Sequence, residues 1–162
     1  MIGCPGAGKS IFARALREKA GLPLYYLDTI WHKSDRTTVS EQEFDEKLGE
    51  ILREDRWILD GNYLRTLPRR LQACDTVFLL DYPVEICLSG AASRIGQPRE
   101  ALPWVETEFD AEFRRWIEEF PRVQLPQVYA LLERYGKGKT LVIFKDRKDA
   151  AAYLAAFPRQ KT

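Results

Sequence analysis

A Gly-rich segment near the start of the chain constrains the fold more strongly than any other feature of the sequence. The segment matches the pattern G-x-x-x-x-G-K-[ST] at every fixed position and reads Gly3-Cys4-Pro5-Gly6-Ala7-Gly8-Lys9-Ser10. A helical pattern follows over residues 9–20, and Gly21 suits the left-handed position that ends many helices. Because a loop of this kind connects a buried strand to a helix, the pattern predicts an α/β fold.

The residue types of this loop suit the phosphates of a nucleotide. Glycines let the backbone approach phosphate oxygens, and the N–H groups at the start of a helix attract anions. Lys9 is expected to reach the β- and γ-phosphates, and Ser10 is expected to bind Mg²⁺. We therefore expect the loop to bind ATP with Mg²⁺ through Gly3, Pro5, Gly6, Ala7, Gly8, Lys9 and Ser10. The alternative interpretation is a Gly-rich turn that precedes a helix by coincidence.

Short apolar runs alternate with helical patterns along the rest of the chain, as in a parallel sheet built from βαβ units. Residues 1–162 fit one domain, since domains most often hold roughly 100 to 150 residues. We expect the three-layer α/β/α fold of P-loop NTPases, with a five-stranded parallel sheet and the site at the carboxyl edges of the strands. Two apolar stripes predict core-facing helices, one capped by Ser40 and one that includes residues 109–120. The expected strands after the loop cover residues 24–27, 57–59, 76–80 and 140–144.

The chain starts unusually close to the Gly-rich loop. Met1 and Ile2 precede Gly3, whereas the strand before such a loop normally has about five or six residues. In a parallel sheet this strand would be central, so its neighbours would lose hydrogen-bond partners. We therefore expect a truncated first strand, in a chain that is itself truncated or mis-started.

Composition narrows the choice of partners. Twenty-five Lys and Arg residues against 24 Asp and Glu residues give a net charge of +1, which argues against direct nucleic-acid binding. The three cysteines are widely spaced and form no C-x-x-C pair, as expected for reduced thiols in a cytoplasmic protein. The start of the chain does not resemble a secretion signal, and no run approaches the roughly 18 apolar residues of a membrane span. We therefore expect no membrane partner, and no feature predicts an oligomeric state.

The second informative stretch reads W-I-L-D-G-N-Y-L-R-T-L-P-R-R-L. An apolar strand that ends at Asp60 places a carboxylate at the carboxyl edge of the sheet, where it can hold Mg²⁺ through water and orient an acceptor hydroxyl. If the stretch is helical, Arg65 lies one turn beyond Asn62 and Arg69 one turn beyond Arg65, so their side chains can face a phosphate or carboxylate. We expect Gly61, Asn62, Arg65 and Arg69 to bind the acceptor. The alternatives are a solvent-facing Asp60, and Arg69 and Arg70 as surface charge only.

Several motifs of the chain recur in known kinases. Three of them read Gly3-Cys4-Pro5-Gly6-Ala7-Gly8-Lys9, Leu59-Asp60-Gly61-Asn62-Tyr63-Leu64-Arg65-Thr66-Leu67-Pro68-Arg69 and Leu80-Asp81-Tyr82-Pro83. In these motifs the chain resembles the adenylate kinase-like branch of nucleoside and small-molecule kinases. It is more similar still to the bacterial DNA topology modulation proteins, which are P-loop kinase-like proteins with the motifs L-P-x-Y-x-L-D, W-I-x-D-G-N-Y and G-K-x-x-x-x-F. These motifs stand at residues 22–28, 57–63 and 138–144, so the resemblance spans nearly the whole chain.

The resemblance implies a kinase-type core with a mobile lid. It also implies roles for the polar residues of the motifs: ATP phosphates on Lys9, Mg²⁺ near Ser10 and Asp60, and acceptor contacts from Asp28 and Arg65. The residue pattern agrees for Asp28, because this residue ends a short apolar strand three residues before Trp31. The Trp31 ring can stack on an acceptor ring, and simple packing is its alternative role.

A lid is expected at about residues 94–105, as a short helical segment. Gly96 and Pro98 within it suit a hinge. In phosphoryl transfer, an arginine delivered by such a segment offsets charge on the transferring group. Arg94 and Arg99 are therefore candidate catalytic residues, together with Lys9, Asp60 and Arg65.

Three functions fit these features. The first is an ATP-binding kinase that transfers the γ-phosphoryl group to a nucleoside monophosphate or another small metabolite. The second is a nucleotide-binding regulatory protein that affects DNA topology or expression without kinase turnover. The third, an NTP hydrolase without an acceptor, is disfavoured by the arginine row after Asp60, which suits a second anion. ATP turnover that needs an acceptor would favour the first function, and salt-dependent DNA retention would favour the second.

Overall fold

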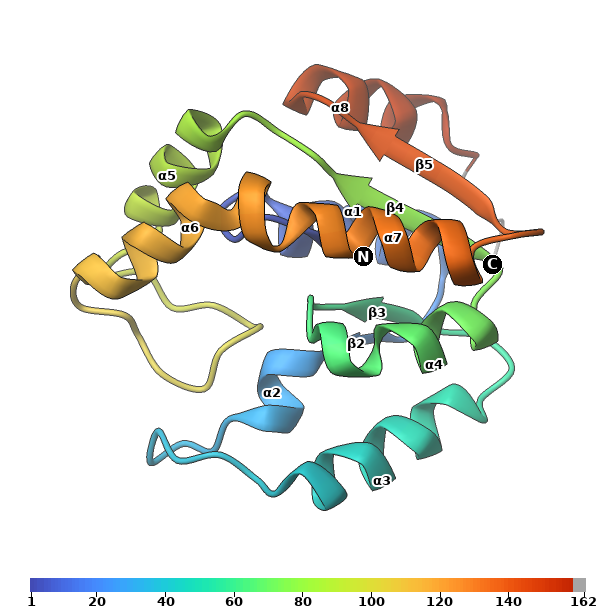
Figure 1. The fold of residues 1–162 in the computed structure, drawn as a ribbon, viewed down its shortest axis with the longest axis horizontal. Coiled ribbons are helices and arrows are strands. Elements are labelled where there is room, and N and C mark those ends of the chain that lie inside the picture. Colours follow the sequence, from blue (N-terminus) through green and yellow to red (C-terminus); the bar gives the residue numbers. More distant parts are fainter. Residues whose placement is uncertain (159–162) are drawn as a thin grey trace.

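The computed structural model of the chain describes residues 1–158. Strands and helices alternate along most of the chain, so the expected α/β class is confirmed (Figure 1). The elements are β1 (Ile2–Gly3), α1 (Lys9–Ala20), β2 (Leu24–Tyr26), α2 (Leu27–Trp31), α3 (Glu41–Leu52), β3 (Ile58–Asp60), the 3-10 turn η1 (Leu64–Thr66), α4 (Leu67–Ala73), β4 (Thr76–Leu80), α5 (Val84–Ser93), α6 (Ala111–Val123), α7 (Leu125–Tyr135), β5 (Thr140–Phe144) and α8 (Arg147–Ala156).

The strands form two parallel sheets, in the orders β1-β4-β5 and β2-β3. The expectation of one five-stranded sheet is therefore wrong, because β1 has two residues and is too short to pair along the whole of both neighbours. Met1 nevertheless connects the sheets: its amino group donates to Leu59 O over 2.5 Å, and Gly61 N donates to Met1 O over 3.2 Å. The two sheets thus meet at the residue that precedes β1.

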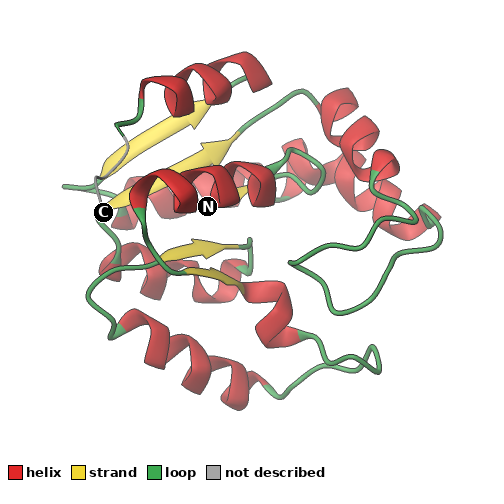
Figure 2. Cartoon of the chain, turned by 180° about the vertical axis from the view of Figure 1, so that it is seen from behind, coloured by secondary structure: helices red, strands yellow, loops and turns green. Residues whose placement is uncertain are grey.

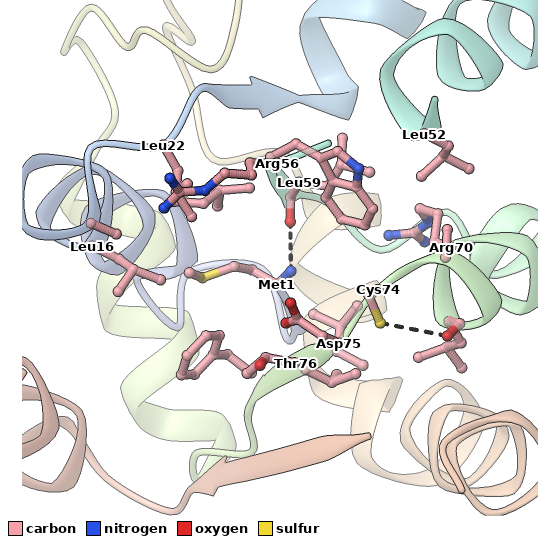
Figure 3. A pocket seen from close by; sticks show the side chains of 18 of the residues that line it. Met1, Leu16, Leu22, Leu52, Arg56, Leu59, Arg70, Cys74, Asp75 and Thr76 are labelled. Atoms are coloured by element: carbon pink, nitrogen blue, oxygen red, sulfur yellow. Dashed lines mark hydrogen bonds between the residues drawn. The ribbon is translucent and has the colours of Figure 1, made fainter. Parts of the chain in front are cut away.

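A cavity of about 380 Å³ lies beside Met1, between the start of β3 and the start of β4. Figure 3 shows the Met1 side chain and its hydrogen bond to Leu59 in this cavity, with Leu16 and Leu22 on one side and Arg70 on the other. The cavity lies where β1 is too short to separate the two neighbouring strands.

Helices cover both faces of the sheets, as the two opposite views in Figures 1 and 2 show. Alternate residues of β4 pack on opposite sides, which is the period of a strand buried on both faces. Val77 and Leu79 pack in one cluster with residues of α4 and α7, while Phe78 and Leu80 pack in another with residues of α1, α5 and α8. Phe12 of α1 lies 5.1 Å from the Phe78 ring, centroid to centroid. A third cluster joins α3 to β2, β3 and α2.

The predicted helix ends are confirmed where a local signal marked them. Gly21 follows α1 with φ 62, and Ser40 Oγ accepts a hydrogen bond from Glu43 N over 3.1 Å at the start of α3. The stripe on α6 is confirmed in part, because Ile117 and Phe120 are buried whereas Trp116 is 38% exposed. Within residues 1–158, no helix has the length and apolar character needed to cross a membrane.

Candidate functional site

The Gly-rich loop leaves the carboxyl end of β1 and leads directly into α1 (Figure 1). Gly8 is the N-cap residue of α1 and has φ 97, in the left-handed region that favours glycine. No side chain caps this helix end. The first N–H groups of α1 therefore remain available to an anion at the carboxyl edge of the sheets.

Lys9 folds back over the loop. Its Nζ donates to Gly3 O over 2.9 Å and to Cys4 O over 3.1 Å. The ammonium group thus lies above the concave side of the loop and makes hydrogen bonds to neutral carbonyl groups. A phosphate oxygen is a stronger acceptor for an ammonium group than a carbonyl oxygen is, because that hydrogen bond joins two charges.

Ser10 and Asp60 connect α1 to the end of β3. Ser10 Oγ donates to Asp60 Oδ2 over 2.6 Å, and the Asp60 residue is 5% exposed. The second carboxylate oxygen, Oδ1, is buried and has no hydrogen-bond partner among the described residues. A buried polar atom without a partner is costly, so this oxygen is suited to a bound water molecule or cation.

The chemistry of this pair fits Mg²⁺. Hydroxyl and carboxylate oxygens are ligands that Mg²⁺ uses, and water and substrate phosphates usually complete its coordination. Residues 1–158 contain no group of three or more His, Cys, Asp and Glu side chains arranged to hold a metal ion. Ser10 and Asp60 alone would leave most of the coordination of Mg²⁺ to other ligands.

A pocket of about 680 Å³ opens beside the Gly-rich loop. It lies between this loop, α8 and the segment that follows α5. Its described lining carries one carboxylate, that of Glu100, and the cationic side chains of Lys9, Arg14, Arg94, Arg99 and Arg147. Like charges gathered around a concave surface raise the local concentration of counter-ions, so the pocket attracts polyanions.

The expected lid segment, residues 94–105, lies along this pocket but is irregular instead of helical. Gly96 takes φ 75, which is outside the right-handed helical region, and Pro98 has no N–H group to donate. The segment runs from the end of α5 toward α2, where Trp104 contacts His32 edge-on with ring centroids 5.0 Å apart. The lid segment therefore extends from the pocket beside the Gly-rich loop to the residue that follows α2.

The lid arginines share one carboxylate. Glu106 Oε2 lies 3.2 Å from Arg94 Nε and 2.7 Å from the Arg99 guanidinium group. All three side chains are about one-fifth exposed, at 21%, 21% and 22% for Arg94, Arg99 and Glu106. Burial lowers the pKa of Arg94 and the charge of Arg99 lowers it further, whereas Glu106 and Asp28 oppose this effect. Glu106 thus offsets the repulsion between two cations at the edge of the pocket.

Asp28 lies in the first turn of α2, directly after β2. Tyr63 donates its hydroxyl hydrogen to Asp28 Oδ1 over 2.7 Å. Burial and the Asp28 carboxylate raise the pKa of Tyr63, so this phenol stays a donor. Tyr63 has φ 37, in the left-handed region that a bulky residue rarely adopts, and its ring stacks on Phe44 at 5.1 Å. The surrounding contacts therefore fix the position of this hydroxyl group.

Gly61 and Asn62 follow the end of β3 directly. Asn62 Oδ1 accepts a hydrogen bond from Gly3 N over 3.0 Å, so the side chain contacts the Gly-rich loop. A Cβ atom on Gly61 would lie 2.8 Å from the Leu27 side chain, which is too close for any other residue. Both residues hold the end of β3 against its neighbours, and their predicted contact with an acceptor stays a prediction.

The other predicted acceptor residues are engaged elsewhere. The Arg65 guanidinium group makes two hydrogen bonds of 2.9 Å to the Asp45 carboxylate on α3. Arg69 donates to Asp45 O over 3.1 Å. Trp31 packs on Phe44 with ring centroids 5.5 Å apart, which agrees with the alternative that Trp31 has a packing role. The structure therefore does not bring Arg65 and Arg69 to the Gly-rich loop. Their spacing in the sequence consequently no longer argues against an NTP hydrolase.

Arg70 supports the site from within, whereas surface charge was the alternative role that its sequence position left open. It is 5% exposed and donates to Gly61 O over 2.9 Å, to Tyr63 O over 3.1 Å and to Asn62 O. Burial lowers its pKa to about 10. A signal was present, because Arg70 lies three residues after the buried Leu67 and shares its helix face.

Three more residues of the site were missed. Arg14 lies one helical turn after Ser10 on α1, and Arg147 follows the predicted strand 140–144, so both positions were accessible to spacing arguments. Glu106 lies in a segment without periodicity and had no such signal. No known protein family matches the chain, and no curated protein has a significantly similar sequence.

Replacing Arg70 tests its structural role. In Arg70→Met the carbonyl oxygens of Gly61, Asn62 and Tyr63 lose their buried donor, so we expect the free energy of unfolding to fall by about 3 kcal/mol. Urea denaturation of the purified protein measures this change. Arg69→Met is the control and should cost about 0.5 kcal/mol or less, since Arg69 is at the surface. Equal losses in both variants would contradict the assignment.

Gly90 of α5 supports the loop by its lack of a side chain. A Cβ atom at this position would lie 2.0 Å from Gly6 O. We expect Gly90→Ala to push the loop away from α5 and to destabilise the protein by about 1 to 3 kcal/mol. Thermal denaturation measures the loss, and Ser89→Ala, on the exposed side of the same helix, serves as the control. A Gly90→Ala protein as stable as the control would show that the loop does not depend on this contact.

Proposed function

We propose that the chain is a P-loop kinase that uses ATP and Mg²⁺ to phosphorylate a small acceptor molecule. The observation that carries this proposal is the hydrogen bond from Ser10 to Asp60, whose Oδ1 is buried without a partner, together with the cationic pocket that Ser10 lines. A hydroxyl, a carboxylate and a Gly-rich loop at a helix N-terminus are the parts that a Mg²⁺–nucleotide site requires.

The phosphates of ATP would lie along the Gly-rich loop. The N–H groups of the loop and of the first turn of α1 would bind their oxygens, and Lys9 would exchange its bonds to Gly3 and Cys4 for the β- and γ-phosphates. Arg14 and Arg147 add positive charge to the same pocket. Mg²⁺, held near Ser10 and Asp60, would supply charge neutralisation and in-line orientation of the phosphates.

The lid arginines would act on the group that is transferred. Arg94 and Arg99 both line the pocket and are held together by Glu106 at its edge. Their guanidinium groups would stabilise the negative charge of the γ-phosphoryl group in the transition state, and the lid segment would exclude water from it. A transferase needs both of these roles, whereas a simple binding protein needs neither.

The motifs of the sequence support a place in the P-loop kinase-like group that includes the DNA topology modulation proteins. The split sheets are compatible with this proposal, since β1 and the Gly-rich loop lie between β3 and β4. The three free thiols suit a reducing compartment such as the cytoplasm. A regulatory protein that binds nucleotide without turnover would share the same pocket, so an acceptor-dependent assay distinguishes the two functions.

Loss of Lys9 should abolish turnover. We expect the purified protein to consume ATP in the presence of Mg²⁺ and an acceptor, and Lys9→Ala and Asp60→Asn to lower kcat/KM by about 10²-fold or more. A coupled assay for ADP measures this against a panel of hydroxylated and phosphorylated metabolites. Lys19→Ala, in the last turn of α1, is the control and should retain activity. Tight ATP binding without turnover would instead favour the regulatory function.

Glu106 offers a second test of the pocket. Because its carboxylate competes with phosphate for Arg94 and Arg99, we expect Glu106→Gln to lower the Kd for ATP by about three- to tenfold. Equilibrium dialysis with labelled ATP measures the change, and the exposed Glu108→Gln is the matched control. Weaker binding by Glu106→Gln alone would mean that Glu106 positions the arginines and does not compete with the ligand.

A further inference from the structure

The arginines predicted to bind an acceptor are already paired within the protein. A phosphorylated acceptor needs cationic partners, and Arg65 and Arg69 are the residues whose spacing predicts them. Arg65 is instead bound by both oxygens of Asp45, and Glu41 adds a further ion pair at 3.6 Å. These contacts hold the Arg65 side chain against α3 and neutralise it.

Arg70 cannot take over this function. Its guanidinium group is buried and donates to the three carbonyl oxygens that follow β3. Turning it toward an acceptor would break these bonds and leave buried carbonyl groups without partners. The arginines that follow Asp60 in the sequence are thus used to hold the protein together.

Carboxylates follow both strands of the small sheet. The parallel register of β2 and β3 pairs Tyr26 with Asp60, so Asp28 and Asp60 follow from the same edge of this small sheet. Like charges repel at short range in a partly buried site, and this arrangement opposes a second phosphate. A hydroxyl group, in contrast, can donate to a carboxylate.

We propose that the acceptor is an uncharged hydroxyl compound, such as a polyol, sugar or nucleoside, and that Asp28 accepts the proton of its hydroxyl group. This inference rests on the proposed kinase function and narrows it, because nucleoside monophosphates are then poor acceptors. Tyr63 holds Asp28 Oδ1 by a hydrogen bond, and no partner is described for Oδ2. The hydrogen bond from Tyr63 therefore holds Oδ1 in place, while Oδ2 can accept a hydrogen bond from the acceptor.

Phosphoryl transfer to this hydroxyl group is a displacement at the γ-phosphorus. The acceptor oxygen forms a bond to the γ-phosphorus, the bond from that phosphorus to the bridging β–γ oxygen breaks, and its electron pair leaves on ADP. The acceptor proton passes to Asp28 Oδ2, and from there to solvent.

A bisubstrate compound tests the charge of the acceptor side without knowledge of the acceptor. Diadenosine pentaphosphate carries the phosphates of ATP together with those of an acceptor nucleotide. We expect it to bind within about threefold of the Kd for ATP, measured by isothermal titration calorimetry with Mg²⁺. Binding that is about 30-fold tighter than that of ATP, and that is lost in Arg65→Ala or Arg69→Ala, would overturn the inference.

The role of Asp28 has its own test. With the uncharged acceptor that gives the highest turnover, we expect Asp28→Asn to lower kcat by about 10²-fold and to leave the Kd for ATP unchanged. The exposed Asp55→Asn is the control. Higher kcat/KM for nucleoside 5′-monophosphates than for the matching nucleosides would overturn the inference while leaving the kinase function intact. A wild-type protein that binds no ATP would overturn both.

Discussion

The structure depends on a strand of two residues that holds the Gly-rich loop between two sheets. β1 pairs with β4 on one side, and on the other side Met1 makes main-chain hydrogen bonds to the end of β3. Gly3 N also donates to the side chain of Asn62. Because these few bonds fix where the loop begins, they also fix the start of α1 relative to Asp60 and the space in which an anion can be bound.

Local patterns predicted the elements well, and the sheet less well. The strands 76–80 and 140–144 and the start and end of α1 follow from apolar runs, glycine and caps that act within a few residues. Whether β1 joins its two neighbours into one sheet depends on pairing between segments more than 50 residues apart, as between Met1 and Leu59. Local sequence patterns do not indicate how many residues of two distant strands will pair.

The residues of the site likewise include some that local patterns predict and some that they do not. Lys9, Ser10 and Asp60 were predictable because a motif specifies them and a strand end places them. The arginines after Asp60 were not, since a helical spacing gives the relative direction of side chains and not which face is buried. Asp45 on α3 attracts Arg65, while Arg70 faces inward, and both outcomes depend on tertiary contacts.

The cavity beside Met1 also separates two strand edges. Among the described residues, the first part of β4, residues 76–78, has strand partners in β5 alone, and Ile58 of β3 pairs with β2 alone. These two strand edges lie on either side of the cavity, whose lining combines apolar side chains with charged ones such as Arg70 and Asp75 (Figure 3). Unpaired edges of this kind are templates for an additional extended chain. An extended segment bound in this cavity would lie between β3 and β4 and would join the two sheets into one.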